Sequence, residues 1–241
     1  MRASVFTTCL VDALFPNVGD ALVTLFARLN VRLDIPDQTC CGQMHINTGY
    51  RSMALALVRN HVRAFASSEY VVGLSASCVG SVRHQYESIA AESGDDRLVE
   101  GVRCLREKTY EVSEFLIDVL GVDDVGAYFP HRVTYHPTGH SLRVLHLGDR
   151  PTTLLQHVEG IELVELHGAD ECCGFGGTFS VKNADVSGAM LADKLLHVRS
   201  TGAEVLAACD SSCLMHMGGG LSLAGDDVRP LHLVEILASS R

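Results

Sequence analysis

The sequence predicts an α/β fold of two pseudo-symmetric Rossmann-like repeats, each built on a parallel sheet with one CCG motif. Short apolar runs typical of buried strands alternate with longer segments of helical periodicity. This alternation occurs twice along the 241 residues, and strands that alternate with helices indicate parallel sheets. Each half also contains one CCG motif, Cys40-Cys41-Gly42 in the first and Cys172-Cys173-Gly174 in the second.

Further features repeat around the two motifs. A Gly-Asp pair lies upstream of each motif, and an apolar run followed by another cysteine lies downstream: Gly19-Asp20 and Gly148-Asp149, then 70–74 before Cys78 and 204–208 before Cys209 and Cys213. Four features in one order indicate an internal duplication. We therefore expect a first CCG repeat at 1–92, a helical connector at 93–130 and a second CCG repeat at 131–241.

The two repeats predict matching elements. In the first we expect strands at 3–8, 31–35 and 69–74, with helices at 19–29 and 47–66. The apolar positions of the second helix are Met53, Leu55, Leu57, Val58, Val62 and Phe65. In the second repeat we expect strands at 132–135, 162–166 and 203–208, with helices at 149–158 and 179–200. The connector predicts a helix at 109–120 that ends at Gly121, and the tail predicts a closing helix at 231–238.

Composition excludes several classes of partner. The formal net charge of -10 disfavours nucleic acid and anionic membrane surfaces. No apolar run approaches the roughly 20 residues that a membrane span requires. The apolar run from Ser4 ends early at Asp12, so we interpret it as a buried strand rather than a signal peptide. These features predict a cytoplasmic protein.

Nine cysteines are unusual in a reducing compartment, where structural disulfides are rare. Most of them follow predicted strands, and parallel strands place these loops at one edge of a sheet. We therefore expect Cys9, Cys40, Cys41 and Cys78 to converge in the first repeat, and Cys172, Cys173, Cys209 and Cys213 to form the matching group in the second. Cys104 lies outside both groups and is expected to be an inert thiol that behaves as a small hydrophobe.

Glycines accompany the predicted metal ligands. Gly42, Gly174, Gly176 and Gly177 would allow the backbone to approach a bulky cofactor closely. Helices follow both motifs, and a helix N-terminus stabilises the thiolate that binds metal. Soft thiolate sets select iron–sulfur clusters, zinc or Cu(I). Zinc stays an alternative although its usual CxxC spacing is absent, and a metal-free thiol redox pair is a further alternative.

At these residues the sequence resembles the cysteine-rich CCG-domain proteins of the lactate-utilization protein A type. The resemblance extends from Val5 to about Leu237. Its motifs are Cys9-Leu10-Val11-Asp12, Cys40-Cys41-Gly42-Gln43, Ser77-Cys78, the segment from Glu171 to Lys182, and Cys213-Leu214-Met215. The same domain occurs in a cysteine-rich component of heterodisulfide reductase and in the iron–sulfur component of glycolate oxidase.

The resemblance implies an iron–sulfur electron-transfer subunit of a cytoplasmic complex that oxidises L-lactate to pyruvate. Its implied partners are a ferredoxin-like iron–sulfur subunit and a third small subunit, and a small 2-hydroxy acid is a candidate substrate. In the heterodisulfide reductase relatives each repeat binds a [4Fe-4S] cluster through a leading cysteine, the CC pair and a trailing CxxC. An alternative role is a zinc-stabilised, non-catalytic assembly subunit, and another is a metal-free thiol-disulfide reductase.

The chain departs from that family pattern at both sites. In the first half Ser75 replaces one trailing cysteine, which leaves four thiols for one cluster. In the second half Gly139 stands where the leading cysteine is expected, with His140 as a substitute ligand. A second cluster, a degenerate site and a site for a different metal or substrate all remain open. His136 and His140 are candidates for proton handling during lactate oxidation.

Overall fold

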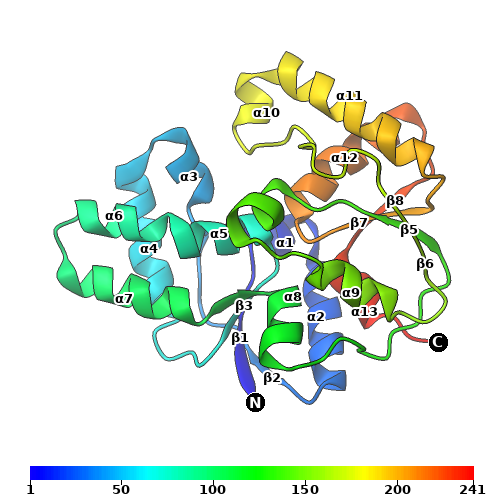
Figure 1. The fold of residues 1–241 in the computed structure, drawn as a ribbon. Coiled ribbons are helices and arrows are strands. Elements are labelled where there is room, and N and C mark those ends of the chain that lie inside the picture. Colours follow the sequence, from blue (N-terminus) through cyan, green and yellow to red (C-terminus); the bar gives the residue numbers. More distant parts are fainter. The chain divides into compact units, whose positions relative to one another are not determined.

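The computed structural model describes all residues from Met1 to Arg241. The chain forms two compact units, Met1–Phe115 and Leu116–Arg241. Each unit contains one four-stranded sheet in which every strand pairs in parallel with its neighbours (Figure 1). The predicted α/β fold with two parallel-sheet repeats is therefore confirmed. The finer division at residues 92, 93, 130 and 131 stays a prediction.

The sheet of the first unit has the strand order β2-β1-β3-β4. Its strands are β1 Arg2–Phe6, β2 Arg32–Asp34, β3 Val71–Gly73 and β4 Thr109–Glu111. The central strand β1 is buried from Ala3 to Phe6 and β3 is buried throughout, as expected of parallel strands that are covered on both faces. The first three strands occupy the predicted positions, whereas β4 was not predicted as a strand.

The sheet of the second unit repeats this order as β6-β5-β7-β8. Its strands are β5 Arg132–Tyr135, β6 Glu162–Val164, β7 Val205–Ala208 and β8 Arg229–His232. Strand β7 is buried throughout, and β8 lies at the sheet edge with Pro230 exposed. Proline is compatible with an edge strand because it has no amide hydrogen to donate.

Helices connect the strands within each unit. Those that begin in the first unit are α1 Cys9–Leu14, α2 Pro16–Arg28, α3 Gln43–Thr48, α4 Arg51–Ala64, α5 Ala76–His84, α6 Tyr86–Glu92, α7 Asp96–Glu107, α8 Val112–Glu114 and the π-helical turn η1 Phe115–Val119. Those of the second unit are the π-helical turn η2 Ser141–Leu145, α9 Arg150–Gln156, α10 Phe179–Lys182, α11 Ala184–Ser200, α12 Ser211–Ala224 and α13 Leu233–Ala238. None of these helices combines the length and the hydrophobicity that a membrane-spanning segment requires.

Three helix predictions were wrong in detail. The helix expected at 109–120 begins instead as strand β4, because Thr109 to Glu111 pair in parallel with Val71 to Gly73. The helix expected at 47–66 is broken at Gly49, whose φ of +89° ends α3. The helix expected at 179–200 is likewise divided, at Asn183 between α10 and α11.

The buried face of α4 also differs from the prediction. Its core side is formed by Ala54, Val58 and His61, and the buried Phe65 follows directly after the helix at the same spacing of about one turn. Met53, which was assigned to the apolar face, is 58% exposed. His61 occupies a core position that hydrophobic periodicity does not predict, because histidine counts as a polar residue.

The strand order creates a ligand-binding edge in each sheet. From β1 the chain crosses to β2 on one side, and from β3 it crosses to β4 on the other. The carboxyl ends of β1 and β3 therefore form a topological switch point, where open α/β sheets bind ligands. Strands β5 and β7 form the equivalent point in the second sheet.

Candidate metal centre

The cysteines of the first unit come from loops and helix starts at this switch point. Cys9 is the first residue of α1 after β1, and Cys40 and Cys41 lie in the loop between β2 and α3. Cys78 lies in the first turn of α5 after β3. Every one of these side chains thus follows the carboxyl end of a strand, as the topology requires.

The four thiols form one connected group. The Sγ atoms of Cys9 and Cys40 are 3.7 Å apart. Cys41 interacts through its thiol with both Cys40 and Cys78. Cys41 and Cys78 are buried, whereas Cys9 is exposed and Cys40 is half-buried. The group therefore extends from the core of the unit to its surface.

Protons are distributed unequally among these thiols. Hydrogen bonding with Cys41 and Cys9 lowers the pKa of Cys40 to about 2. The same contacts, together with burial, raise the pKa values of Cys9 and Cys41 above that of a free thiol. One thiolate is thus stabilised by its protonated neighbours. A bound cation would release the remaining protons, because thiolate is the form that binds metal.

The surroundings fix the buried half of the group. Ser75 caps α5 by accepting a hydrogen bond from the backbone N–H of Cys78 (3.3 Å). The Tyr86 hydroxyl donates to the carbonyl of Cys41 (2.7 Å). Gly42 has a φ of +81°, a conformation that favours glycine, and its N–H lies 3.4 Å from the Cys40 sulfur. Such an N–H contact stabilises negative charge on that sulfur.

The second unit repeats part of this arrangement. The Gly174 N–H lies 3.4 Å from the sulfur of Cys172, the same contact that Gly42 makes with Cys40. Gly174 also has a positive φ, of +92°. Cys213 lies in the first turn of α12, as Cys78 does in α5, and here Asp210 is the capping residue. Gly176 and Gly177 lie in the loop that leads to α10.

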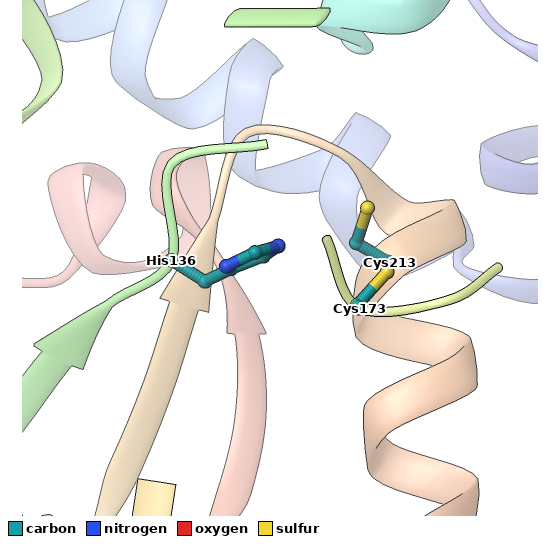
Figure 2. Close-up of side chains that lie close together, drawn as sticks. All are labelled: His136, Cys173 and Cys213. Atoms are coloured by element: carbon teal, nitrogen blue, oxygen red, sulfur yellow. The ribbon is translucent and has the colours of Figure 1, made fainter. Parts of the chain in front are cut away.

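A histidine joins the cysteines of the second site. The ligand atoms of His136, Cys173 and Cys213 all lie within 4.8 Å of one another. Figure 2 shows the imidazole, which follows β5, directed toward the two sulfur atoms. His136 is 1% exposed, and burial followed by the charge of Lys194 lowers its pKa to about 3. The imidazole is therefore neutral, which is the form that binds metal.

The thiols of this site also shift one another's pKa values. Cys172 lowers the pKa of Cys173, but Cys213 and burial outweigh this contribution and raise it to about 12. The hydrogen bond with Cys173 raises the pKa of Cys172. Cys172 is exposed and Cys173 is 1% exposed. In both CC pairs the first cysteine is therefore the more exposed one and the second is buried.

The remaining predicted site residues are placed differently. Cys209 is fully buried, with its sulfur 3.2 Å from the Tyr135 hydroxyl, and does not belong to the His136 group. His140 is half-buried and precedes η2, one residue after Gly139. Cys104 is exposed on α7, 3.7 Å from Glu100, so its expected behaviour as a small hydrophobe is wrong.

Lys194 is a site residue that the sequence did not reveal. It is fully buried on α11, and its Nζ donates to the carbonyl of Gly168 (2.5 Å). Its ammonium group senses the charges of Glu171, Cys173, Asp170 and Cys172, which raise its pKa against the larger, lowering effect of burial. The sequence offered one indication of this burial: Lys194 lies between Leu191 and Leu195 on a helix that packs against the core.

The donor sets are suited to soft or borderline metals. The first site offers four sulfur atoms, and the second offers three sulfur atoms with one unpartnered imidazole. Thiolate and imidazole ligands favour zinc, iron and iron–sulfur clusters over hard cations, which require oxygen. The residues present therefore fit an iron–sulfur cluster or zinc, and they do not fit magnesium or calcium.

Comparisons with known proteins agree with this architecture. The family model of the CCG cysteine-rich domain matches residues 3–83 and again 133–218. A solved structure of an aspartate racemase homologue from Pyrococcus horikoshii OT3 covers 98% of this chain and 95% of its own, with 9% identity and a TM-score of 0.35. A likeness that weak carries no argument.

Curated relatives match over their full lengths. Lactate utilization protein A of Oceanobacillus iheyensis is 45% identical over 242 residues, which cover 100% of this chain and 98% of the relative. Lactate utilization protein A of Bacillus subtilis (strain 168) is 42% identical and covers 99% of this chain and 100% of the relative. The chain therefore belongs to the lactate utilization protein A family of CCG cysteine-rich domain proteins.

Proposed function

We propose that this protein is an iron–sulfur electron-transfer subunit that acts in the oxidation of L-lactate to pyruvate. The observation that carries the proposal is the connected group of Cys9, Cys40, Cys41 and Cys78 at the switch point of the first sheet. Four thiolates are the usual ligand number of a [4Fe-4S] cluster. When bound, such a cluster supplies one-electron transfer.

The protein holds the cysteine ligands in place and leaves one side of the site accessible to a partner. Cys41 and Cys78 are buried and held by Tyr86 and Ser75, so they fix the inner side of the site. Cys9 and Cys40 lie toward the surface, where an electron-transfer partner has access. The N–H of Gly42 and the first turn of α5 place positive partial charge beside thiolates, which stabilises their ionised form.

The link to lactate comes from the relatives, which are named for lactate utilization. We propose that the complex is cytoplasmic and that the partners are a ferredoxin-like iron–sulfur subunit and a third small subunit. A 2-hydroxy acid is the proposed substrate class of the complex. Proton handling by His140, which lies at the carboxyl end of the second sheet, stays a prediction for the same reaction.

Metal analysis tests this proposal. Protein purified without oxygen is expected to contain iron and acid-labile sulfide in equal amounts, with the visible absorption of a cluster. Cys41→Ser is expected to lose at least one cluster equivalent, because it removes a buried ligand whose place no other thiol takes. Cys104→Ser is the matched control, since that thiol is exposed on α7 away from the group, and it should keep the full content.

Other outcomes separate the alternatives. Zinc without iron, even after anaerobic reconstitution with iron and sulfide, would contradict the cluster and favour a zinc-stabilised assembly subunit. Reversible oxidation of the cysteines with no metal at all would favour a thiol-disulfide reductase. Equal iron in Cys41→Ser and Cys104→Ser would show that the first site does not hold the cluster.

A further inference from the structure

Both ring nitrogens of His136 are buried and neither has a hydrogen-bond partner. His61 has the same property, but its imidazole packs against the aromatic rings of Phe6, Phe65 and Tyr86, whereas His136 faces two thiols. Buried polar atoms are nearly always satisfied, so each exception calls for a physical cause. Leaving such an atom unpaired lowers stability, a loss that an apolar residue at the same core position would avoid.

The surroundings of the imidazole supply that cause. The nearest group with matching chemistry is the pair of thiols on Cys173 and Cys213, within 4.8 Å (Figure 2). A thiol is a weak hydrogen-bond partner, whereas one metal ion would satisfy a ring nitrogen and both sulfurs at once. The three residues come from three different segments, after β5, before α10 and at the start of α12, so no local turn brings them together.

The three ligand atoms lie within 4.8 Å of one another, close enough to converge on one ion. Tetrahedral zinc holds its nitrogen and sulfur ligands about 3.5–3.8 Å apart, given bonds of about 2.0–2.3 Å. The thiols of the first site are also in contact with one another, so the feature that distinguishes the second site is its buried imidazole, since His136 and Cys173 are each only 1% exposed.

We propose that His136, Cys173 and Cys213 bind a single divalent ion of the zinc class, which makes the second CCG site chemically different from the first. His136 then compensates for the thiol that is missing at Gly139. The exposed Cys172 or a water molecule is available as a fourth ligand. This inference rests on the proposed function only in assigning the cluster to the first site.

Cobalt titration tests the site directly. The probe is Co²⁺ alone, added without oxygen to the full-length Cys40→Ser/Cys41→Ser variant, in which the first site is disabled. We expect the visible bands of tetrahedral cobalt with thiolate charge transfer, and their loss on competition with Zn²⁺. His136→Ala in the same background is expected to weaken binding about tenfold or more, since even outer residues of metal sites have effects of this size.

Two further variants make the outcome decisive. His157→Ala, at an exposed histidine just after α9, is the matched control and should leave affinity and spectrum unchanged. His136→Cys should retain tight binding with stronger thiolate charge transfer, which a purely structural histidine would not produce. Equal affinity and spectra for His136→Ala and its parent would overturn the proposal, and so would the absence of tetrahedral cobalt in the parent. Iron bound at the first site of the unmodified chain is a separate measurement, so the two proposals fail independently.

Discussion

Gly174→Ala is expected to lower the free energy of unfolding by about 2–4 kcal/mol, because two penalties act together. Gly174 has a φ of +92°, which strains any residue with a Cβ. An added Cβ would also lie 2.6 Å from the backbone carbonyl oxygen of Ser187, which has no side-chain freedom to move away. Denaturant unfolding followed by circular dichroism measures the loss.

Gly188→Ala, on the same helix that supplies Ser187, is the matched control for this prediction. A Cβ at Gly188 would meet nothing within 4 Å, and the residue lies inside α11. Alanine is the better helix former, so the variant should gain about 0.5–1 kcal/mol. Opposite signs for the two variants are the expected result, and a Gly174→Ala protein as stable as its parent would contradict the backbone argument.

Stability is expected to fall as pH rises from about 4.5 to about 7, with Glu111 as one cause. Burial, opposed by hydrogen bonds from Ser113, raises the pKa of Glu111 from 4.5 to about 7. The folded state therefore holds a proton that the unfolded state releases in this window, so folding loses free energy with increasing pH. A shift of this size corresponds to about 3 kcal/mol.

Glu111→Gln should abolish most of that slope, because the amide does not ionise. One side-chain oxygen of Glu111 is buried without a hydrogen-bond partner. Removing the negative charge therefore removes the cost of burying that charge without a partner. Glu107→Gln, at an exposed residue, is the control and should leave the slope as it is. Unfolding free energies at pH 5 and pH 8 are the measurement, and an unchanged slope in Glu111→Gln would refute the assignment.

Much of the scaffold could be predicted from the sequence because buried parallel strands have continuous apolar runs. The runs before Cys78 and Cys209 gave β3 and β7 close to their observed positions. Strands β4 and β8 were missed for a physical reason. Both are edge strands of three or four residues with polar or proline positions, and their pairing depends on the neighbouring strand rather than on their own pattern.

The candidate site was predictable in outline for the same topological reason. Loops after parallel strands meet at one edge, so cysteines far apart in sequence were expected to converge. The role of His136 was not predictable, since nothing local distinguishes a histidine that faces two thiols from one that faces water. Lys194 was missed although it lies between Leu191 and Leu195, because lysine is usually exposed and its burial here depends on packing against the core of the second unit.

All the proposed metal ligands lie in loops or first helical turns, and none lies within a strand. Selection can therefore exchange a thiol for another residue without disturbing the ladder of backbone hydrogen bonds that gives each unit its form. Gly139, which stands where the family resemblance implies a cysteine, lies in such a loop after β5, so the difference leaves the strand pairing of the second sheet intact.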